Sequence, residues 1–497
     1  MTSTTDTARS TVALRHPDRF FIGGEWVAPS SDATIDVFDT ATEELFLRVA
    51  EAQAADVDRA AAAARTAFDD GPWPELSHAE RAGYLRAMAE GVRARADEAS
   101  RIWPSESGIL HSAAQARLVG IANFYESYAD LADTYPFEER ATPTAGGAFG
   151  LLVREPVGVV AAIIPWNGPM SLIAHKIAPA LLAGCTVVLK ASPEAPGNAL
   201  LIAEIAESVG LPPGVLNVLT ADREVSELLV RDPRIDKISF TGSTVAGRRI
   251  ASLCGDRIAR VTLELGGKSA AVVLDDADLE RTAATLSAAE CSISGQVCSS
   301  LTRIIVGRSR HDALLEALAS TFSKVRVGDP FDPATEMGPL AMSRQRDRVL
   351  GYIEKGVAEG ATLATGGGRP AHLDRGWYVE PTVFGNVDNH STIAREEIFG
   401  PVLSVIPADD EADAVRVAND TIYGLNSSVF TSDVERARAV GRKLRSGTVG
   451  HNNFRTDFGI AFGGFKQSGL GREGGKEGLS HYLETKTMIL EDVPEGY

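Results

Sequence analysis

Between residues 157 and 255 the chain alternates short apolar runs with helical segments, and no other feature constrains its fold as strongly. The apolar runs are rich in β-branched residues and predict buried strands at 157–164, 186–190, 216–219 and 237–240. The intervening segments predict helices at 169–184, 192–210, 223–230 and 243–254. Strands that alternate with helices form a parallel, doubly wound sheet, so the fold class is α/β.

Ligands of such sheets bind beyond the carboxyl ends of the strands. The residues to watch are therefore Pro165-Trp166-Asn167, Lys190 and Thr241-Gly242-Ser243, each just after or at the end of a predicted strand. The sequence Ser192-Pro193-Glu194 has the capping hydroxyl, the first-turn proline and the acid of a helix start, and Gly210 marks the predicted end of that helix.

The second half repeats the alternation less regularly. Strands are predicted at 270–274, 303–307, 402–406, 427–430 and 448–452, and helices at 278–292 and 311–325. Because 497 residues suffice for two or three domains, we expect a second α/β domain from about residue 267. The Ala-rich segment 55–100 predicts surface helices ahead of the first sheet.

Composition excludes several classes of protein. Hydrophobic residues make up 44% of the chain and charged residues 23%, as in globular proteins, and the net charge is −18. That charge repels phosphate backbones and anionic lipid, so we expect no nucleic-acid or membrane partner, and an anionic ligand needs a local binding device.

Four cysteines without a CxxC pair indicate reduced thiols in a cytoplasmic protein. The first 20 residues have no apolar core, which predicts a mobile tail and no secretory signal.

Two glycine motifs resemble nucleotide-binding loops. The GxGxxG at 469–474 does not follow a strand, so we interpret it as a glycine-rich loop. Residues 242–247 have P-loop glycine spacing, but Arg248-Arg249 replace the required Lys and Ser/Thr, which excludes an NTPase. What remains is a strand, a turn and a helix start that either binds phosphate or is simply well capped.

Two residues have chemistry suited to catalysis. Cys298 lies among small polar neighbours, which favours an accessible nucleophile over buried packing. Glu264 interrupts an apolar strand before two glycines, and is either a general base or an edge-strand acid facing water. Because HExxH and GxSxG motifs are absent, metallohydrolase and serine-hydrolase chemistry lose their support and no metal is expected.

Together these residues resemble the aldehyde dehydrogenase superfamily, from about Phe20 to the C-terminus. The matching stretches, in family order, are Pro165-Trp166-Asn167, VVLKASP (187–193), LPPGVLNV (211–218), FTGST (240–244), LELGGKS (263–269), GQVC (295–298), EEIFGPVL (396–403), and GGFKQSG with GRE (463–473). The resemblance implies a Rossmann-like coenzyme domain (1–134 and 155–266), a second α/β catalytic domain (267–478) and a small β oligomerisation element (135–154 and 479–497). It also implies a homodimer or homotetramer.

The resemblance implies a reaction as well: NAD(P)-dependent oxidation of an aldehyde to a carboxylic acid. Cys298 would form a thiohemiacetal and then a thioester, Asn167 would stabilise the oxyanion, and Glu264 would activate water. The implied coenzyme contacts are Trp166, Lys190, Gly242, Ser243, Glu397 and Phe399, and the implied proton path is Lys466 with Glu473.

Two departures from the family pattern bear on specificity. Gly168 follows Asn167 where many relatives have a bulky aromatic residue, which predicts a wider tunnel and a bulky apolar or aromatic aldehyde. Pro193 stands where NAD-preferring relatives often have an acid, but Glu194 is adjacent, so NAD is favoured with NADP as the alternative.

Two other functions remain as alternatives. Relatives that transfer the acyl group to CoA lack the base, so Glu264 argues against that function. An inactive structural relative is opposed by the presence of Cys298, Glu264 and Asn167 together.

Overall fold

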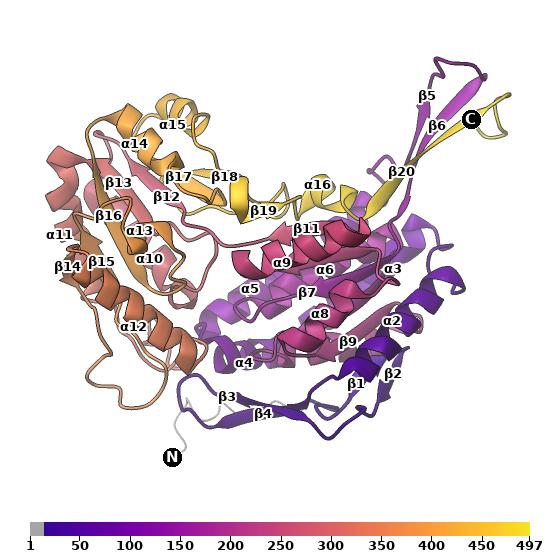
Figure 1. The fold of residues 1–497 in the computed structure, drawn as a ribbon, viewed down its shortest axis with the longest axis horizontal. Coiled ribbons are helices and arrows are strands. Elements are labelled where there is room, and N and C mark those ends of the chain that lie inside the picture. The colour runs from indigo at the N-terminus through magenta and orange to yellow at the C-terminus, as the bar shows by residue number, and fades with distance from the viewer. Residues whose placement is uncertain (1–13) are drawn as a thin grey trace.

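The computed structural model describes residues 14–497, so residues 1–13 of the predicted tail lie outside the described residues. Two large sheets lie side by side, and a narrow arm of three strands projects beside the first (Figure 1). The α/β fold class predicted from the sequence is confirmed.

The first sheet has eight strands in the order β19-β11-β10-β7-β8-β9-β1-β2. Its five central strands are parallel, while β1, β2 and β19 are antiparallel to their neighbours. The strands are β1 (Phe20–Ile22), β2 (Glu25–Val27), β7 (Val159–Ile163), β8 (Thr186–Ala191), β9 (Leu216–Thr220), β10 (Lys237–Thr241), β11 (Arg260–Glu264) and β19 (Gly469–Leu470).

The strand order reverses direction between β7 and β10, which are neighbours in the sheet. Such a reversal leaves a crevice at the carboxyl ends of the two strands. Trp166-Asn167 follow β7 at this edge, Gly242-Ser243 follow β10, and Glu264 ends β11 opposite Thr241. The topology therefore brings three predicted site segments to one edge.

Alternate residues of the first sheet face two different cores, as a doubly wound sheet requires. Val160 and Ala162 of β7 pack against α3, α4, α5, α6 and α7, while Val159 and Ala161 pack against α2, α8 and α9. The helices are α2 (Ala54–Asp69), α3 (His78–Ala94), α4 (Ala96–Ser107), α5 (His111–Leu131), α6 (Pro169–Ala183), α7 (Gly197–Ser208), α8 (Arg223–Arg231) and α9 (Thr244–Arg257).

Helix α7 begins at Gly197, five residues after the start predicted at Ser192. The Ser192 hydroxyl donates to the Glu194 carboxylate and does not cap the helix. The cap comes from α4, whose buried Glu106 carboxyl accepts the Gly197 N–H at 2.8 Å. The prediction was wrong because the acceptor lies 91 residues away in the sequence.

The second sheet has seven strands in the order β14-β15-β16-β13-β12-β17-β18, all parallel except β14. The strands are β12 (Ala270–Val273), β13 (Arg303–Gly307), β14 (Thr362–Thr365), β15 (Thr382–Gly385), β16 (Val402–Ala408), β17 (Asn426–Phe430) and β18 (Thr448–His451). Around it lie α10 (Leu279–Cys291), η1 (Ser292–Gly295), η2 (Arg308–Arg310), α11 (His311–Phe322), α12 (Ser343–Ala358), α13 (Thr392–Arg395), α14 (Glu411–Asn419) and α15 (Val434–Gly441), and η3 (Lys466–Ser468) and α16 (Gly475–Ser480) follow.

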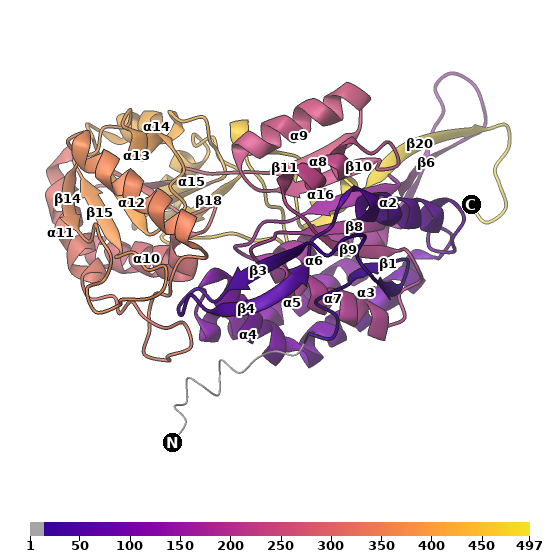
Figure 2. The same ribbon diagram turned by 60° about the horizontal axis from the view of Figure 1, so that its bottom comes forward.

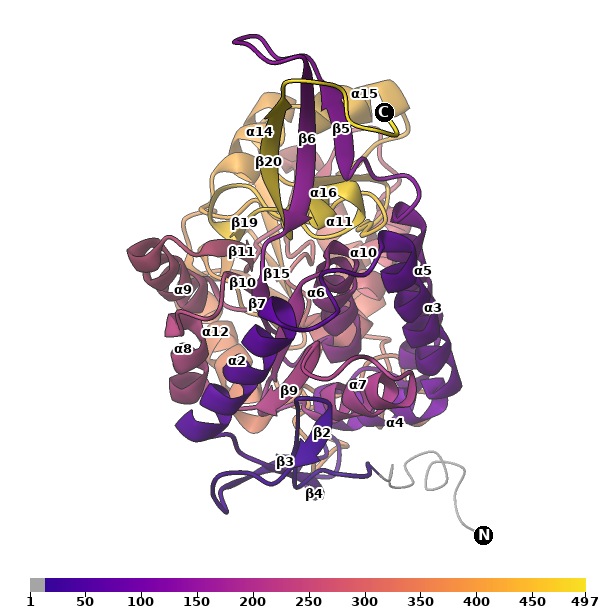
Figure 3. The same cartoon turned by 90° about the vertical axis from the view of Figure 1, so that its right-hand side faces the viewer.

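The arm is an antiparallel sheet in which β6 (Phe149–Pro156) lies between β5 (Glu138–Ala141) and β20 (Leu483–Leu490) (Figure 3). A separate hairpin of β3 (Thr34–Phe38) and β4 (Leu45–Ala50) lies across the front of the view in Figure 2. Its turn joins the two halves, because Thr40 donates its N–H to Ser105 and accepts the N–H of Trp377. Within residues 14–497, no helix is both long enough and apolar enough to cross a bilayer.

The buried Glu106 cap predicts a stability phenotype. Glu106→Ala removes the acceptor of Gly197 and leaves a cavity, so we expect a loss of about 2 kcal/mol and a melting temperature about 4–8 °C lower. Burial raises the pKa of Glu106 to about 8, so Glu106→Gln replaces a largely protonated carboxyl and should cost much less at pH 7.

A comparison of the wild type with Glu106→Gln tests the raised pKa of Glu106. A carboxyl whose pKa is raised on folding stabilises the protein fully below its unfolded-state pKa, and that contribution is lost as the pH rises towards 8. Thermal melts at pH 6 and pH 8.5 should therefore show the melting temperature of the wild type falling relative to that of Glu106→Gln. A constant difference would contradict the raised pKa.

Candidate active site

A cavity of about 880 Å³ opens at the carboxyl edge of the first sheet. Asn167, Glu264, Cys298 and Glu473 all line it, although they come from distant parts of the chain. Much of the remaining lining is apolar and aromatic. The structure thus brings three predicted catalytic residues and one predicted proton-path residue to a single cavity.

Cys298 is partly exposed, whereas the other three cysteines are buried. Burial raises the pKa of its thiol strongly, and the nearby carboxylates of Glu397 and Glu264 raise it further. Backbone N–H groups of Ser299 and Cys298 lower the pKa by a smaller amount. The thiol therefore stays protonated at neutral pH until a group nearby accepts its proton or brings positive charge to the sulfur.

The loop before Cys298 is strained and firmly anchored. Ile293 and Ser294 have φ of 50° and 54°, a region that L residues and above all β-branched ones rarely adopt. The buried Gln296 amide donates to the carbonyls of Ser107 and Ile293 and accepts the N–H of Ala341. This single side chain ties the loop to the end of α4 and to the segment just before α12.

Asn167 is held by the same anchor. Its side-chain Nδ2 donates to the backbone carbonyl of Gln296 at 2.9 Å. The backbone carbonyl of Asn167 accepts the Trp103 indole N–H at 3.1 Å. An amide nitrogen has two hydrogens, so the second remains for a ligand in the cavity.

Two glycines allow the second half of the site to approach the first. A Cβ at Gly267 would lie 2.2 Å from the Cys298 carbonyl oxygen, and one at Gly266 would lie 2.5 Å from Glu397 Oε2. The Gly267 N–H donates to Glu397 Oε1 at 3.0 Å. Any side chain at these two positions would push Cys298 or Glu397 away from Glu264.

Glu264 is only 3% exposed, and neither of its carboxyl oxygens has a hydrogen-bond partner among residues 14–497. Burial raises its pKa well above the ordinary value, and the Glu473 carboxylate raises it further. Lys176 and Arg472 act in the opposite direction. A buried carboxyl with free lone pairs and a raised pKa is suited to accept a proton.

Glu473 pairs with a lysine that the sequence analysis missed. Lys176 Nζ lies 2.5 Å from Glu473 Oε1, and both side chains are buried. The available signal was a lysine within the mostly apolar helix α6. Lys466, the predicted partner on the proton path, instead donates to the carbonyls of Asn419 and Thr421.

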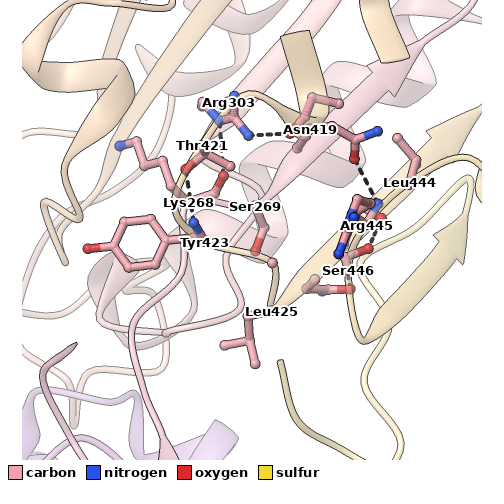
Figure 4. A pocket seen from close by; sticks show the side chains of 15 residues that line it. Lys268, Ser269, Arg303, Asn419, Thr421, Tyr423, Leu425, Leu444, Arg445 and Ser446 are labelled. Atoms are coloured by element: carbon pink, nitrogen blue, oxygen red, sulfur yellow. Dashed lines mark hydrogen bonds between the residues drawn. The ribbon is translucent and has the colours of Figure 1, made fainter. Parts of the chain in front are cut away.

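The two residues that accept from Lys466 line a separate, much smaller cavity. It has a volume of about 20 Å³ and also contacts Lys268 and Arg303 (Figure 4). Lys466 thus lies beside this cavity. Within residues 14–497 it forms no hydrogen bond or ion pair with Glu473, which is paired with Lys176 instead.

The residues predicted to contact a dinucleotide flank the same edge of the first sheet. Lys190 is buried, and burial lowers its pKa to about 8. Its ammonium donates to the backbone carbonyl of Ala221 over a long distance of 3.5 Å. Ser243 caps the 14-residue helix α9, whose first N–H groups are free for a phosphate. Trp166 and Phe399 pack edge to face at 5.4 Å. A buried lysine with one weak hydrogen bond, the start of a helix and this aromatic pair together fit the binding of a dinucleotide.

Glu397 adds a carboxyl to this surface, and burial raises its pKa to about 7. Near Lys190, the Glu194 carboxylate accepts from the Ser192 hydroxyl and forms an ion pair with Arg344 of α12. Its charge also raises the pKa of Lys190. Negative charge therefore stands next to the lysine predicted to bind the adenosine ribose.

Comparisons with known proteins agree with this geometry. The model of the aldehyde dehydrogenase family matches residues 26–488. Geranial dehydrogenase of Castellaniella defragrans is 45% identical and the alignment covers 95% of this chain and 98% of that protein. 3-Succinoylsemialdehyde-pyridine dehydrogenase of a Pseudomonas species is 42% identical, covering 96% and 99%.

Solved structures agree as well. Mycobacterium tuberculosis aldehyde dehydrogenase complexed with NAD⁺ superposes with a TM-score of 0.93 at 44% identity, covering 97% of this chain and 99% of that one. Aldehyde dehydrogenase C of Pseudomonas syringae, in complex with NAD⁺ and octanal, gives 0.93 at 41% identity, covering 98% and 100%.

The chain belongs to the aldehyde dehydrogenase family. It is an oxidoreductase that acts on an aldehyde with NAD, and the predicted family, fold class, enzyme class and cofactor are confirmed. CoA acylation is not favoured.

The charges around Glu264 predict opposite pH shifts from two adjacent substitutions. Glu473→Gln removes a carboxylate that raises the pKa of Glu264, so the acidic limb of kcat/KM should move to lower pH. Arg472→Gln removes a cation that lowers that pKa, so the same limb should move to higher pH. Shifts in the same direction would show that the limb does not report Glu264, and a melt of each variant checks that it is folded.

Proposed function

We propose that this enzyme oxidises a bulky apolar or aromatic aldehyde to its carboxylic acid through a thioester on Cys298, with NAD as the preferred coenzyme. The observation that carries the proposal is the 880 Å³ cavity, which combines an apolar wall with Cys298, Asn167 and Glu264. A nucleophile, an amide donor and a buried base on one cavity are the parts that acyl transfer needs.

In the first step the Cys298 sulfur forms a bond to the aldehyde carbon, and the carbonyl oxygen becomes an oxyanion. The free hydrogen of Asn167 Nδ2 and the Cys298 N–H stabilise this oxyanion, each donor contributing about 3–4 kcal/mol. The thiol proton needs an acceptor because burial keeps the thiol protonated, and Glu264 is suited to that role. Bound NAD supplies the acceptor for the hydride that leaves the aldehyde carbon.

Loss of that hydride leaves a thioester on Cys298. Glu264 first passes on the proton it took from the thiol and then takes a proton from water, whose oxygen adds to the thioester carbon; the carbon–sulfur bond breaks, the sulfur leaves as a thiolate and the acid is released. The proton on Glu264 needs a way out, and the adjacent Glu473–Lys176 pair offers one. The proposed route does not use Lys466, whose ammonium donates to the carbonyls of Asn419 and Thr421.

The proposed aldehyde class rests on the cavity wall. A Cβ at Gly168 would only touch Leu172 and Trp103, each at 3.8 Å, so the space beside Asn167 is open to a large substrate. Phe124, Phe458 and other aromatic side chains line the rest. Octanal in one similar structure and geranial in the name of one relative are both larger apolar aldehydes.

The preference for NAD rests on Glu194. Its carboxylate lies near Lys190, which is the proposed ribose contact, and would repel the extra phosphate of NADP. NADP is the alternative coenzyme. Arg344 would then leave its ion pair with Glu194 and bind the extra phosphate of NADP.

Assembly and compartment are proposed on other grounds. The arm exposes most of β5 and β20, which supports a homodimer or homotetramer formed through residues 135–154 and 479–497. The coenzyme domain is then 1–134 with 155–266, and the catalytic domain 267–478. Four unpaired cysteines support a reducing compartment, the cytoplasm.

The covalent steps predict distinct outcomes for two substitutions. Cys298→Ser should abolish aldehyde-dependent NADH formation. Glu264→Gln should form about one NADH per subunit more slowly than the wild type, because the thiol loses its proton acceptor, and then stop, because the thioester is not hydrolysed. A rapid-mixing experiment measures both effects. Unchanged steady-state turnover of Glu264→Gln would contradict the proposed base. If neither an NADH burst nor an acid-stable acyl label on the protein forms, Glu264 is essential for a step that precedes hydride loss.

The open space at Gly168 predicts a change in substrate preference. Gly168→Phe should lower kcat/KM for octanal and benzaldehyde about tenfold to a hundredfold while sparing acetaldehyde. The control is Gly255→Phe, at a helix position where an added side chain meets open space. A wild-type preference for acetaldehyde over both larger aldehydes would overturn the proposed class.

A further inference from the structure

The outer part of the main cavity lies between two helices, each of which contributes one face. Helix α5 contributes Arg117, Gly120, Ile121 and Phe124, spaced as one helical stripe. Helix α10 contributes Thr285, Ala288 and Ala289, with Ser292 directly after it, at the same spacing. Small residues on both faces leave room for a chain-like substrate between them.

Aromatic contacts show which end of the α5 stripe lies near the catalytic residues. The Phe124 ring lies 4.6 Å from His175, and His175 stacks on Phe458 at 3.7 Å. Phe458 in turn stacks on Phe462, which directly precedes Gly463; a Cβ at Gly463 would lie 2.6 Å from Glu264 Oε1. Phe124 is therefore at the inner end of the stripe.

Arg117 is at the outer end. It precedes Phe124 by two helical turns, a rise of about 10 Å, and its side chain is exposed. The guanidinium donates to Ser292 Oγ at 3.0 Å and thereby spans the two helices at the mouth of the cavity.

Arg117 is the one cationic side chain among the described residues that line this cavity, apart from His175, whose pKa burial lowers to about 3. The anionic lining residues, Glu264 and Glu473, lie at the inner end. Among residues 14–497 no carboxylate forms an ion pair with Arg117. In a protein with a net charge of −18, an unneutralised guanidinium at the substrate entrance is a local device for an anion.

We propose that Arg117 determines specificity by binding a carboxylate at the far end of the substrate, so that the favoured substrates are oxo acids with an apolar chain between aldehyde and carboxylate. The inference rests on the proposed function of Cys298 at the inner end. A guanidinium has five N–H donors in a plane that matches a carboxylate, and Ser292 accepts from only one of its nitrogens. The apolar walls and the small residues of α10 accommodate the chain between the two ends.

The test compares 9-oxononanoate with its methyl ester and with nonanal, three substrates that differ in their far end. For the wild type we expect kcat/KM for the acid to exceed that for the ester about fivefold to tenfold, mainly through KM, as an exposed charge-assisted pair should give. Raising the salt concentration should reduce the ratio.

Substitutions assign the effect to Arg117. Arg117→Gln should bring the ratio of acid to ester close to one and leave kcat/KM for nonanal unchanged, while Arg117→Lys should restore part of the preference. The matched control is Arg281→Gln, which removes the same charge from the exposed part of α10 outside this cavity.

The outcomes separate the two proposals. Turnover of nonanal without a preference for the acid, or a preference that survives Arg117→Gln, overturns the role of Arg117 and leaves the proposed function intact. A preference lost equally in Arg281→Gln would also overturn it, because general surface charge would then explain the effect. Absence of NADH formation with all three aldehydes would overturn the proposed function itself.

Discussion

The chain crosses from the first sheet to the second at Gly266-Gly267, and the site depends on how closely other segments approach this crossing. With no side chain in the way, the Cys298 carbonyl and the Glu397 carboxyl pack directly against the backbone that follows Glu264. Gln296 secures the same loop from the other side. Close packing at two glycines thus sets the distance between a nucleophile on one half and a base on the other.

That closeness has an electrostatic consequence. Cys298, Glu264 and Glu397 lie close together in surroundings that hydrate them poorly, each has a raised pKa, and the carboxylates raise that of the thiol. Several negative charges in a small, poorly hydrated volume repel one another, so ionisation of one group disfavours ionisation of the next. The site therefore favours sharing protons over holding full charges, and the Glu473 carboxylate is tolerated because Lys176 neutralises it.

Much of this could be predicted from the sequence because the information was local. Strands and helices follow from apolar runs, and the parallel topology then assigns Asn167 and Glu264 to one edge of a sheet. What failed depended on distant partners. Helix α7 starts late because its cap comes from Glu106, and the pairing of Lys176 with Glu473 joins residues 297 positions apart. Arg117 carries no local signal at all, since its significance arises only when α5 and α10 face each other across the cavity.

The last part of the chain completes the first part. Strand β20 pairs with β6 along its whole length, and β19 extends the first sheet beside β11. During synthesis at about 5–20 residues per second, Lys176 waits about 15–60 s on the ribosome before Glu473 exists. For that period the nascent protein has an uncompensated ammonium inside an apolar helix and an open strand edge at β6, so chaperone dependence should be greatest in this interval.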